Sequence, residues 1–288
     1  MAAVMMGTDV AKSMKERLIR QTEELKEQGV APALAILRVG ARPDDLSYER
    51  GARKRMELVG IGCRVTELPE DVSQSELEET LQGLNEDPSV HGILVLRPLP
   101  AHLDEEPLKR MIDPEKDMDC MSPVNVAKVF SGDETGYAPC TAEAVMEMLD
   151  YYGVDPKGRR VTIIGRSMVS GRPLAMLFLA RHATVTVCHT RTEDLAGTCR
   201  NAQILVAAAG KARMVTVDMT GADAVVVDVG INVDEDGHLC GDVDFEAVEP
   251  KASLISPVPR GVGSVTTSVL AAHVVRAAQA VCEKRKTE

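Results

Sequence analysis

Residues 160–173 read RVTIIGRSMVSGRP, a strand–turn–helix pattern that is the first indication of a nucleotide-binding α/β fold. It combines a short apolar strand with a glycine at 165, a polar turn, a second glycine at 171 and the start of a helix. In such a turn, backbone N–H groups and a helix N-terminus can face a pyrophosphate, and glycine allows the close approach. Because the spacing is not G-x-G-x-x-G, an ordinary strand–helix turn remains an alternative on this stretch alone.

The following strand indicates which dinucleotide the turn would hold. Strand 184–188 leads into Thr190 and Arg191, and no carboxylate occurs before Glu193. Folds that prefer NAD usually place Asp or Glu near this point, where it binds the ribose hydroxyls. Arg166 and Arg191 could instead hold a 2′-phosphate, because a planar guanidinium matches its geometry. The sequence therefore favours NADP, with NAD as the alternative.

The rest of the chain alternates short apolar runs with longer amphipathic runs, which is typical of βαβ units and parallel sheets. We expect strands at 33–39, 63–68, 92–96, 161–164, 184–188, 204–207, 224–229 and 253–255. We expect helices to begin near Thr8, Asp44 or Asp45, Ser73, Thr141, Gly171, Leu195 and Ser264. The segment 97–139 is rich in Pro, Asp, Lys and Gly, and indicates loops with short helices.

These patterns predict an α/β protein with two domains. Residues 1–138 would form a three-layer α/β substrate domain, and residues 139–263 a Rossmann-like nucleotide-binding domain. No strand follows the last helix, at about 264–288, so we expect it to pack back onto the first domain.

Composition excludes several classes of protein. The formal net charge of −11 argues against a general nucleic-acid-binding surface. No apolar run approaches the roughly 20 residues that span a bilayer, and the first residues lack a secretory signal pattern, so we expect a cytoplasmic protein without a membrane partner. The cysteines are scattered and odd in number, and the histidines show no ligand spacing, so no metal site is expected.

Eight further segments accompany GRSMVSGRP in order along the chain. They are SYERGARKRMELVGI, HGILVLRPLP, PEKDMDCMSPVN, APCTAEAV, VTVCHTRT, VVVDVGINV, CGDVDF and ISPVPRGVGSVTTSVL. Together these segments resemble the methylenetetrahydrofolate dehydrogenase/cyclohydrolase family over nearly the whole chain. The resemblance implies a folate cleft between the two domains, a homodimer, and oxidation of 5,10-methylenetetrahydrofolate by hydride transfer to NAD(P)+ in one-carbon metabolism.

The resemblance also implies roles for single residues. Tyr48 would lie against the pterin ring and Asp119 would bind its amino-pyrimidine edge, and these are the expected catalytic residues. The expected substrate-binding residues are Tyr48, Asp119, Leu96, Pro98 and Gly261. The expected cofactor-binding residues are Thr141, Gly165, Arg166, Ser167, Thr190, Arg191, Ile231, Gly261 and Thr266. Structural alternatives remain: Tyr48 as a boundary aromatic, Asp119 as a turn former and Thr141 as a helix N-cap.

The chain departs from the family pattern at four positions. Ala52 stands where the bifunctional enzymes carry lysine, four residues after the tyrosine, and Leu96 stands where they carry glutamine. Arg260 and Ser264 stand where glycine and proline are usual. The roles of Arg97 and Arg260 stay open, as does the physiological direction of the reaction.

The chemistry of the two activities indicates which of them these changes affect. Hydride transfer from the methylene carbon removes no proton and depends mainly on positioning. Hydrolysis of the methenyl product requires activated water and proton transfer, for which a tuned lysine is suited. We therefore expect a dehydrogenase with weak or absent cyclohydrolase activity, assisted by a separate cyclohydrolase. The alternatives are a fully bifunctional enzyme and a non-catalytic paralogue that binds folate or nucleotide.

Overall fold

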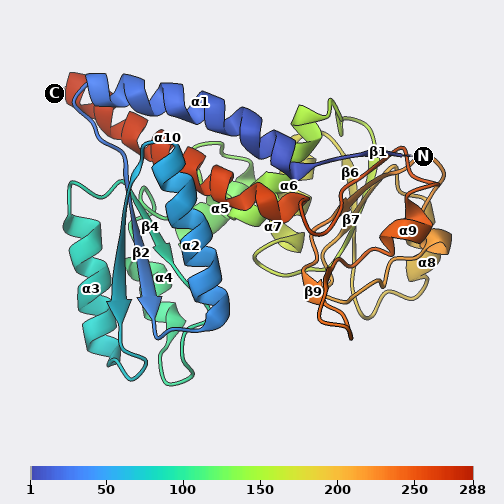
Figure 1. Cartoon of the computed structure of the whole chain (residues 1–288), viewed down its shortest axis with the longest axis horizontal. Coiled ribbons are helices and arrows are strands. Elements are labelled where there is room, and N and C mark those ends of the chain that lie inside the picture. Colours follow the sequence, from blue (N-terminus) through green and yellow to red (C-terminus); the bar gives the residue numbers. More distant parts are fainter. Residues whose placement is uncertain (1, 288) are drawn as a thin grey trace. The chain divides into compact units, whose positions relative to one another are not determined.

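The computed structural model describes residues 2–287 and divides the chain into two compact units. The first unit comprises the N-terminal residues up to Lys12, Val129–Gly132 and Pro139–Thr266. The second comprises Ser13–Lys128, Asp133–Ala138 and the C-terminal residues from Thr267. We call them the six-stranded unit and the three-stranded unit, after their parallel sheets (Figure 1). The predicted two-domain α/β fold is confirmed.

The six-stranded unit contains a sheet of order β1-β11-β8-β7-β5-β6, in which every neighbouring pair of strands runs parallel. The strands are β1 (Ala3–Val4), β5 (Arg160–Ile164), β6 (Thr184–Cys188), β7 (Ile204–Ala207), β8 (Val225–Asp228) and β11 (Leu254–Ile255). The chain passes from β5 to β6 on one side and then to β7 on the other. Open α/β sheets bind ligands at the carboxyl ends of strands where the order reverses in this way.

Helices and a small hairpin complete the six-stranded unit. They are α6 (Cys140–Tyr151), α7 (Gly171–Ala180), α8 (Leu195–Arg200), α9 (Phe245–Val248), the 3₁₀ turns η1 (Val217–Met219) and η2 (Val262–Ser264), and the antiparallel strands β9 (Asn232–Val233) and β10 (Leu239–Cys240). The strands β7 and β8 consist of buried residues throughout. Such continuous apolar runs are typical of parallel strands covered on both faces.

The three-stranded unit has the order β3-β2-β4, again parallel. Its elements are β2 (Ala33–Val39), β3 (Gly62–Leu68), β4 (Gly92–Val95), α2 (Pro43–Leu58), α3 (Gln74–Glu86), α4 (Glu105–Met111), and most residues of α1 (Gly7–Glu27), α5 (Pro123–Ser131) and α10 (Thr266–Thr287). Helices α2 and α3 cover opposite faces of this sheet (Figure 1). The last helix contributes to this unit, where His273 Nδ1 lies 2.8 Å from the carbonyl oxygen of Met118.

Side-chain alternation along β2 assigns the two faces of the sheet. Ala35, Leu37 and Val39 belong to the buried cluster that also contains Leu77 and Leu81 of α3. Because successive side chains of a strand point to opposite faces, Leu34, Ile36 and Arg38 point to the other face, which α2 covers. A buried arginine, Arg38, thus lies near the end of this second row.

Local chemistry accounts for the helix starts. The Ser73 hydroxyl accepts a hydrogen bond from the Glu76 N–H at 3.2 Å and so caps α3. Helix α2 begins with Pro43 in its first turn, just before the two aspartates expected to open it. Helix α1 begins at Gly7, one residue before the predicted Thr8, because the Gly7 N–H donates to the Arg260 carbonyl at 2.9 Å. A Cβ at Gly7 would lie 2.0 Å from the Gly261 carbonyl oxygen, so this approach requires glycine.

Two short strand pairings were not predicted. Strand β1 pairs with β11 through only two residues, Ala3 with Leu254 and Val4 with Ile255. The hairpin of β9 and β10 is equally short. Two-residue strands carry no measurable periodicity, so only the partner strand defines them.

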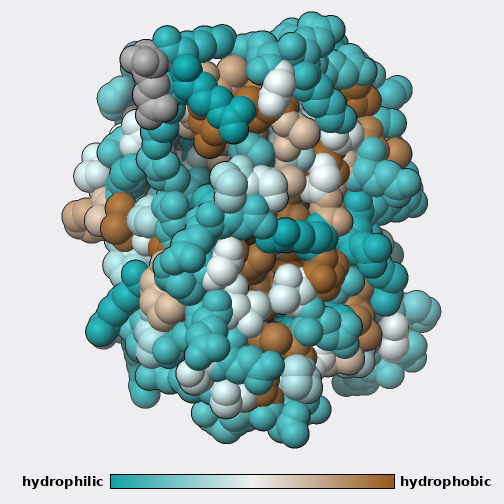
Figure 2. Space-filling model, turned by 90° about the vertical axis from the view of Figure 1, so that its left-hand side faces the viewer, coloured by the Kyte–Doolittle hydropathy of each residue, from teal (hydrophilic) through white to brown (hydrophobic). Residues whose placement is uncertain are grey.

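Hydrophilic side chains cover most of the surface that Figure 2 presents, with apolar side chains in smaller areas between them. Among the described residues 2–287, no helix combines the length and the apolar character that crossing a membrane requires.

Candidate active site

The turn after β5 has the geometry of a phosphate-binding turn. Gly165 adopts φ +120°, and a Cβ there would lie 2.1 Å from the Ala208 carbonyl oxygen at the end of β7. A Cβ at Gly171 would lie 2.1 Å from the Gly165 carbonyl oxygen, so both glycines are required for the turn to close. The Ser167 hydroxyl lies 2.8 Å from the Ser170 hydroxyl and accepts the Ser170 N–H at 3.1 Å. The turn therefore leads directly into the N-terminus of α7 at the point where the strand order reverses.

The ends of β5 and β6 place two arginines at one edge of the sheet. The Gly165 N–H donates to the Cys188 carbonyl at 2.9 Å, which holds the two strand ends together. Arg166 and Arg191 are exposed just beyond these ends. The carboxylate of Asp194 accepts the Gly197 N–H at 2.9 Å as the N-cap of α8, so it is engaged in a structural role. This edge therefore offers positive charge to a bound nucleotide.

Two buried aspartates shape the loop after β8. Asp228 accepts the N–H groups of Gly230, Asp242 and Val243 at 2.8 to 3.0 Å. Burial raises the pKa of Asp228 to about 7, against the lowering effect of these backbone hydrogen bonds, and the nearby charge of Asp242 adds to the rise. The Asp228 carboxylate thus ties the end of β8 to the segment after β10.

Asp242 performs the corresponding task for the end of β7. Its carboxylate accepts the N–H groups of Ala209, Gly210 and Lys211 at 2.6 to 3.0 Å, and the Asn232 side-chain amide at 2.9 Å. The loops after β7 and β8 are therefore held by one pair of carboxylates. The sequence predicted a role for neither aspartate, although an acidic residue at the end of the apolar strand β8 was a detectable signal for Asp228.

The loop after β8 forms one wall of a cavity of about 240 Å³. Ile231 is 65% exposed, and a Cβ at Gly263 would lie 3.5 Å from its Cδ1 atom. Gly261 closes the wall, where a Cβ would lie 2.2 Å from the Pro257 carbonyl oxygen. Arg260 lines the same cavity with φ +77°, a left-handed conformation that favours glycine. Arg260 thus adopts the left-handed backbone conformation that suits glycine, the residue usual at this position in the family pattern.

Two of the three predicted threonines, Thr141 and Thr266, lie near this wall. Thr141 is half-buried in the first turn of α6, which packs against η2. Thr266 begins α10, and its hydroxyl donates to the Gly263 carbonyl at 3.3 Å. The alternative role for Thr141 was the N-cap of its helix. This alternative is not observed, because the N-cap residue of α6 is Pro139.

In the three-stranded unit, the predicted folate residues lie beyond the carboxyl ends of β2 and β4. Tyr48 is half-buried on α2, the helix that follows β2. Ala52, one turn later, is completely buried, and Leu96, just after β4, is 8% exposed. Pro98 follows a cis peptide bond, and its carbonyl accepts a hydrogen bond from Arg42 at 2.8 Å. This hydrogen bond ties the start of α2 to the segment after β4.

Another buried aspartate, Asp117, supports the loop that carries Asp119. Asp117 accepts the N–H groups of Met121 and Ser122 at 2.9 and 2.8 Å, and the Asn125 side-chain amide at 2.9 Å. Asp119 therefore lies on a loop that is fixed from inside, where it is half-buried. The sequence predicted a role for Asp119 but not for Asp117.

The charges in this loop affect the pKa of the Cys120 thiol. Cys120 adopts φ +57°, directly after Asp119. Burial raises the pKa of Cys120 to about 12, the charges of Asp117 and Asp119 add to the rise, and Arg97 opposes it. Arg97 thus lies close enough to this group of acidic residues to act on it electrostatically.

The predicted site residues form two groups. Gly165, Arg166, Ser167, Thr190 and Arg191 gather at the ends of β5 and β6, with Ile231, Gly261, Thr141 and Thr266 around the loop after β8 and η2. Tyr48, Leu96, Pro98 and Asp119 gather at the carboxyl edge of the three-stranded sheet. Each group lies where parallel sheets bind ligands.

The sequence indicated no metal site. Within residues 2–287, one group of possible ligand atoms comes close together, on Asp234, Asp236 and His238 in the β9–β10 turn. Asp234 accepts the backbone N–H groups of Asp236 and His238 at 3.1 and 2.9 Å. These hydrogen bonds account for the cluster as part of the turn itself.

Comparison with known proteins supports the family in both units. The family model for the catalytic domain of tetrahydrofolate dehydrogenase/cyclohydrolase matches residues 5–119, and the model for its NAD(P)-binding domain matches residues 139–282. The bifunctional protein FolD of Clostridioides difficile (strain 630) is 55% identical over 274 residues, which cover 95% of this chain and 96% of that protein.

Solved structures agree with these matches. The bifunctional enzyme FolD from Campylobacter jejuni superimposes with a TM-score of 0.95 at 39% identity, covering 98% of this chain and 100% of that one. The FolD of Trypanosoma brucei, complexed with NADP cofactor and inhibitor, has a TM-score of 0.91 at 37% identity, covering 97% of this chain and 98% of that one.

Proposed function

This chain belongs to the tetrahydrofolate dehydrogenase/cyclohydrolase family, and we propose that it oxidises 5,10-methylenetetrahydrofolate to 5,10-methenyltetrahydrofolate with NADP+ as hydride acceptor. The observation that carries the proposal is the turn after β5, where Gly165 and Gly171 leave room that any Cβ would fill. A bound nicotinamide would take the hydride, and the methylene carbon would become part of an amidinium cation. Since no proton leaves in this step, positioning by the protein is sufficient.

The edge formed by β5 and β6 supports NADP rather than NAD. Arg166 and Arg191 are exposed there, and the Asp194 carboxylate is engaged as a helix cap. A guanidinium binds a 2′-phosphate in a forked geometry, whereas a ribose hydroxyl is usually held by a free carboxylate. Both features favour the phosphorylated nucleotide.

On the folate side, we propose that Tyr48 stacks on the pterin and Asp119 accepts hydrogen bonds from its amino-pyrimidine edge. A carboxylate suits that edge because it accepts two parallel hydrogen bonds. The interior support of the loop by Asp117 keeps Asp119 in place during catalysis. The same residues would serve the reaction in either direction.

Cyclohydrolase activity is proposed to be weak or absent. Ala52 and Leu96 are both buried and carry no group that can move a proton. Lys54 is exposed two positions further along α2, about 200° around the helix. Arg97 and Arg260 carry guanidinium groups, a side-chain type that donates hydrogen bonds and has no acceptor atom to serve as a base. A separate cyclohydrolase would then consume the methenyl product.

A second candidate is the fully bifunctional enzyme, because the curated relative at 55% identity is named a bifunctional protein. One purified sample distinguishes the two. Dehydrogenase turnover would be followed with NADP+ and NAD+, and decay of added methenyltetrahydrofolate would be followed at a pH where spontaneous hydrolysis is slow. Turnover with decay at the buffer rate supports the monofunctional enzyme. Decay well above the buffer rate supports the bifunctional one, and absence of turnover contradicts both.

A further inference from the structure

Helix α2 is attached to the sheet through charged residues in its N-terminal half. Its buried residues are Asp45, Glu49, Ala52 and Met56, of which the first two carry carboxylates. Charged side chains are rarely buried unless they are paired. The buried apolar residues of α2 both lie beyond its midpoint, so the half that carries Tyr48 depends on polar contacts for its placement.

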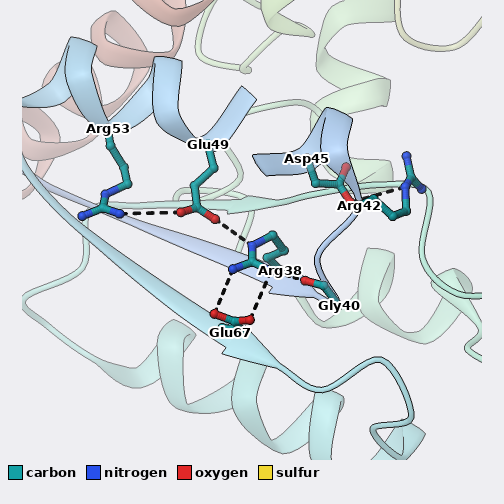
Figure 3. A network of polar contacts seen from close by, with 7 residues as sticks. All are labelled: Arg38, Gly40, Arg42, Asp45, Glu49, Arg53 and Glu67. Atoms are coloured by element: carbon teal, nitrogen blue, oxygen red, sulfur yellow. Dashed lines mark hydrogen bonds and ion pairs between the residues drawn. The ribbon is translucent and has the colours of Figure 1, made fainter. Parts of the chain in front are cut away.

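The main polar contact comes from Arg38 near the end of β2. Its side chain points toward α2, and its Nε atom lies 2.7 Å from Glu49 Oε2 (Figure 3). Arg38 is 4% exposed and Glu49 is 6% exposed, so the pair is shielded from water. On its other side, Arg38 Nη2 lies 2.9 Å from Glu67 Oε2, and a further N–H donates to the Gly40 carbonyl. The guanidinium is thus held from several directions.

The network balances its charges. Arg53 Nη1 lies 3.7 Å from the second oxygen of Glu49, so two arginines meet two glutamates. Arg38 and Glu67 are direct partners in the register of β2 and β3, which fixes the base of the network on the sheet. Burial alone would lower the pKa of Arg38, but hydrogen bonds and charge from Glu49 and Glu67 raise it above its ordinary value. The guanidinium therefore stays charged.

The position of Glu49 connects this network to the folate site. Glu49 directly follows Tyr48 and lies one helical turn before Ala52, on the same buried face of α2. A buried contact of fixed geometry at Glu49 sets the rotation of the helix about its own axis. That rotation determines where the ring of Tyr48 points, because adjacent helix residues are separated by about 100°.

We propose that Arg38 and Glu49 are positioning residues for Tyr48, fixing the rotation of α2 so that the tyrosine ring meets the folate. The inference rests on the proposed function, in which Tyr48 stacks on the pterin.

A purely stabilising role makes a different prediction. Buried ion pairs contribute little net stability compared with apolar residues of similar volume, whereas removal of one partner leaves a buried charge and is strongly destabilising. An apolar double substitution, Arg38→Met with Glu49→Leu, should therefore preserve the fold. Glu67 would then lose its arginine, but it is largely exposed and can be solvated. Only a positioning role predicts that this folded variant handles folate poorly.

The test uses the full chain and two readouts. Steady-state turnover gives kcat/KM for methylenetetrahydrofolate and KM for NADP+, and an equilibrium titration gives Kd for tetrahydrofolate without turnover. The variants are the Arg38→Met/Glu49→Leu pair, Glu49→Gln and the conservative Glu49→Asp. The matched control is Arg64→Met, which removes an arginine of the same unit that pairs with Asp87 at 2.7 Å.

We expect the apolar double variant and Glu49→Gln to lose about 10- to 100-fold in kcat/KM for the folate, with a matching rise in Kd, because small misplacements of a positioning group cost that much. KM for NADP+ should stay within about twofold, Glu49→Asp should recover part of the loss, and Arg64→Met should resemble the unmodified chain. A folded double variant with unchanged folate kcat/KM and Kd overturns the inference and leaves the proposed function intact. Absence of turnover in the unmodified chain overturns the proposed function, and the titration then decides the inference alone.

Discussion

Replacement of Arg166 and Arg191 by alanine is the sharpest test of the nucleotide site. The Gly165–Cys188 hydrogen bond of 2.9 Å holds the ends of β5 and β6 together, so both side chains project from one edge of the sheet. A hydrogen bond to a charged group contributes about 1.5–3 kcal/mol. Both arginines are exposed, so the lower figure applies, which corresponds to about tenfold in affinity for each arginine. Because both arginines would share one phosphate, their losses need not add, and the double substitution should weaken NADP+ binding by at least about tenfold.

The assay compares two nucleotides that differ only in the 2′-phosphate. Equilibrium titrations with NADP+ and NAD+ should show the loss for NADP+ alone, and KM values for the two nucleotides should converge. Arg172→Ala is the matched control, because Arg172 is exposed in the first turn of α7 and its guanidinium lies 3.4 Å from the Met168 sulfur. Equal losses for NADP+ and NAD+ would refute the assignment to the 2′-phosphate, as would an unchanged Kd for NADP+.

Three other variants test the remaining parts of the site. Ala52→Lys combined with Leu96→Gln should raise methenyltetrahydrofolate decay above the buffer rate by about 100-fold, the scale of general acid–base catalysis; decay at the buffer rate would count against the role given to these positions. Gly165→Ala should lower the unfolding free energy by about 1–3 kcal/mol and abolish NADP+ binding, since its Cβ would lie 2.1 Å from the Ala208 carbonyl oxygen; thermal denaturation with a nucleotide titration checks both. Burial raises the pKa of Asp228 to about 7, so the folded chain retains a proton that the unfolded chain releases near pH 4. This contribution to stability is present below pH 4 and declines as pH rises toward 7, by about 1.4 kcal/mol per pH unit. The Asp228→Asn chain should lack this decline when its unfolding free energy is measured against pH. An identical slope in the two chains would contradict the protonated state of Asp228.

The expected homodimer remains a prediction from the family resemblance. Light scattering of the purified chain across a range of concentrations would test it. A mass near the monomer's 31.0 kDa at all concentrations would contradict the dimer.

Local sequence was sufficient to predict the two-domain α/β fold, because the longer strands and helices can be recognised from the spacing of apolar residues within a few positions. The run from Arg160 to Ile164 reads as a strand, and the glycines at 165 and 171 can be recognised as a turn whatever surrounds them. The same is true of Ser73, whose capping hydrogen bond reaches only to Glu76. The roles of Tyr48 and Asp119 were predicted from the family resemblance, because composition and spacing alone left these roles ambiguous.

Tertiary structure decided what depends on partners distant in the sequence. Asp228 and Asp242 both accept hydrogen bonds from other loops, and nothing near either residue in the sequence specifies those donors. Gly7 is required because the chain at Gly261 passes within 2.0 Å of its missing Cβ, more than 250 residues later. Arg38 would be expected on a surface by its charge, yet it is buried, because Glu49 and Glu67 arrive from α2 and β3 to neutralise it. A charged residue within an apolar strand reveals its role only when the fold supplies its counter-charge.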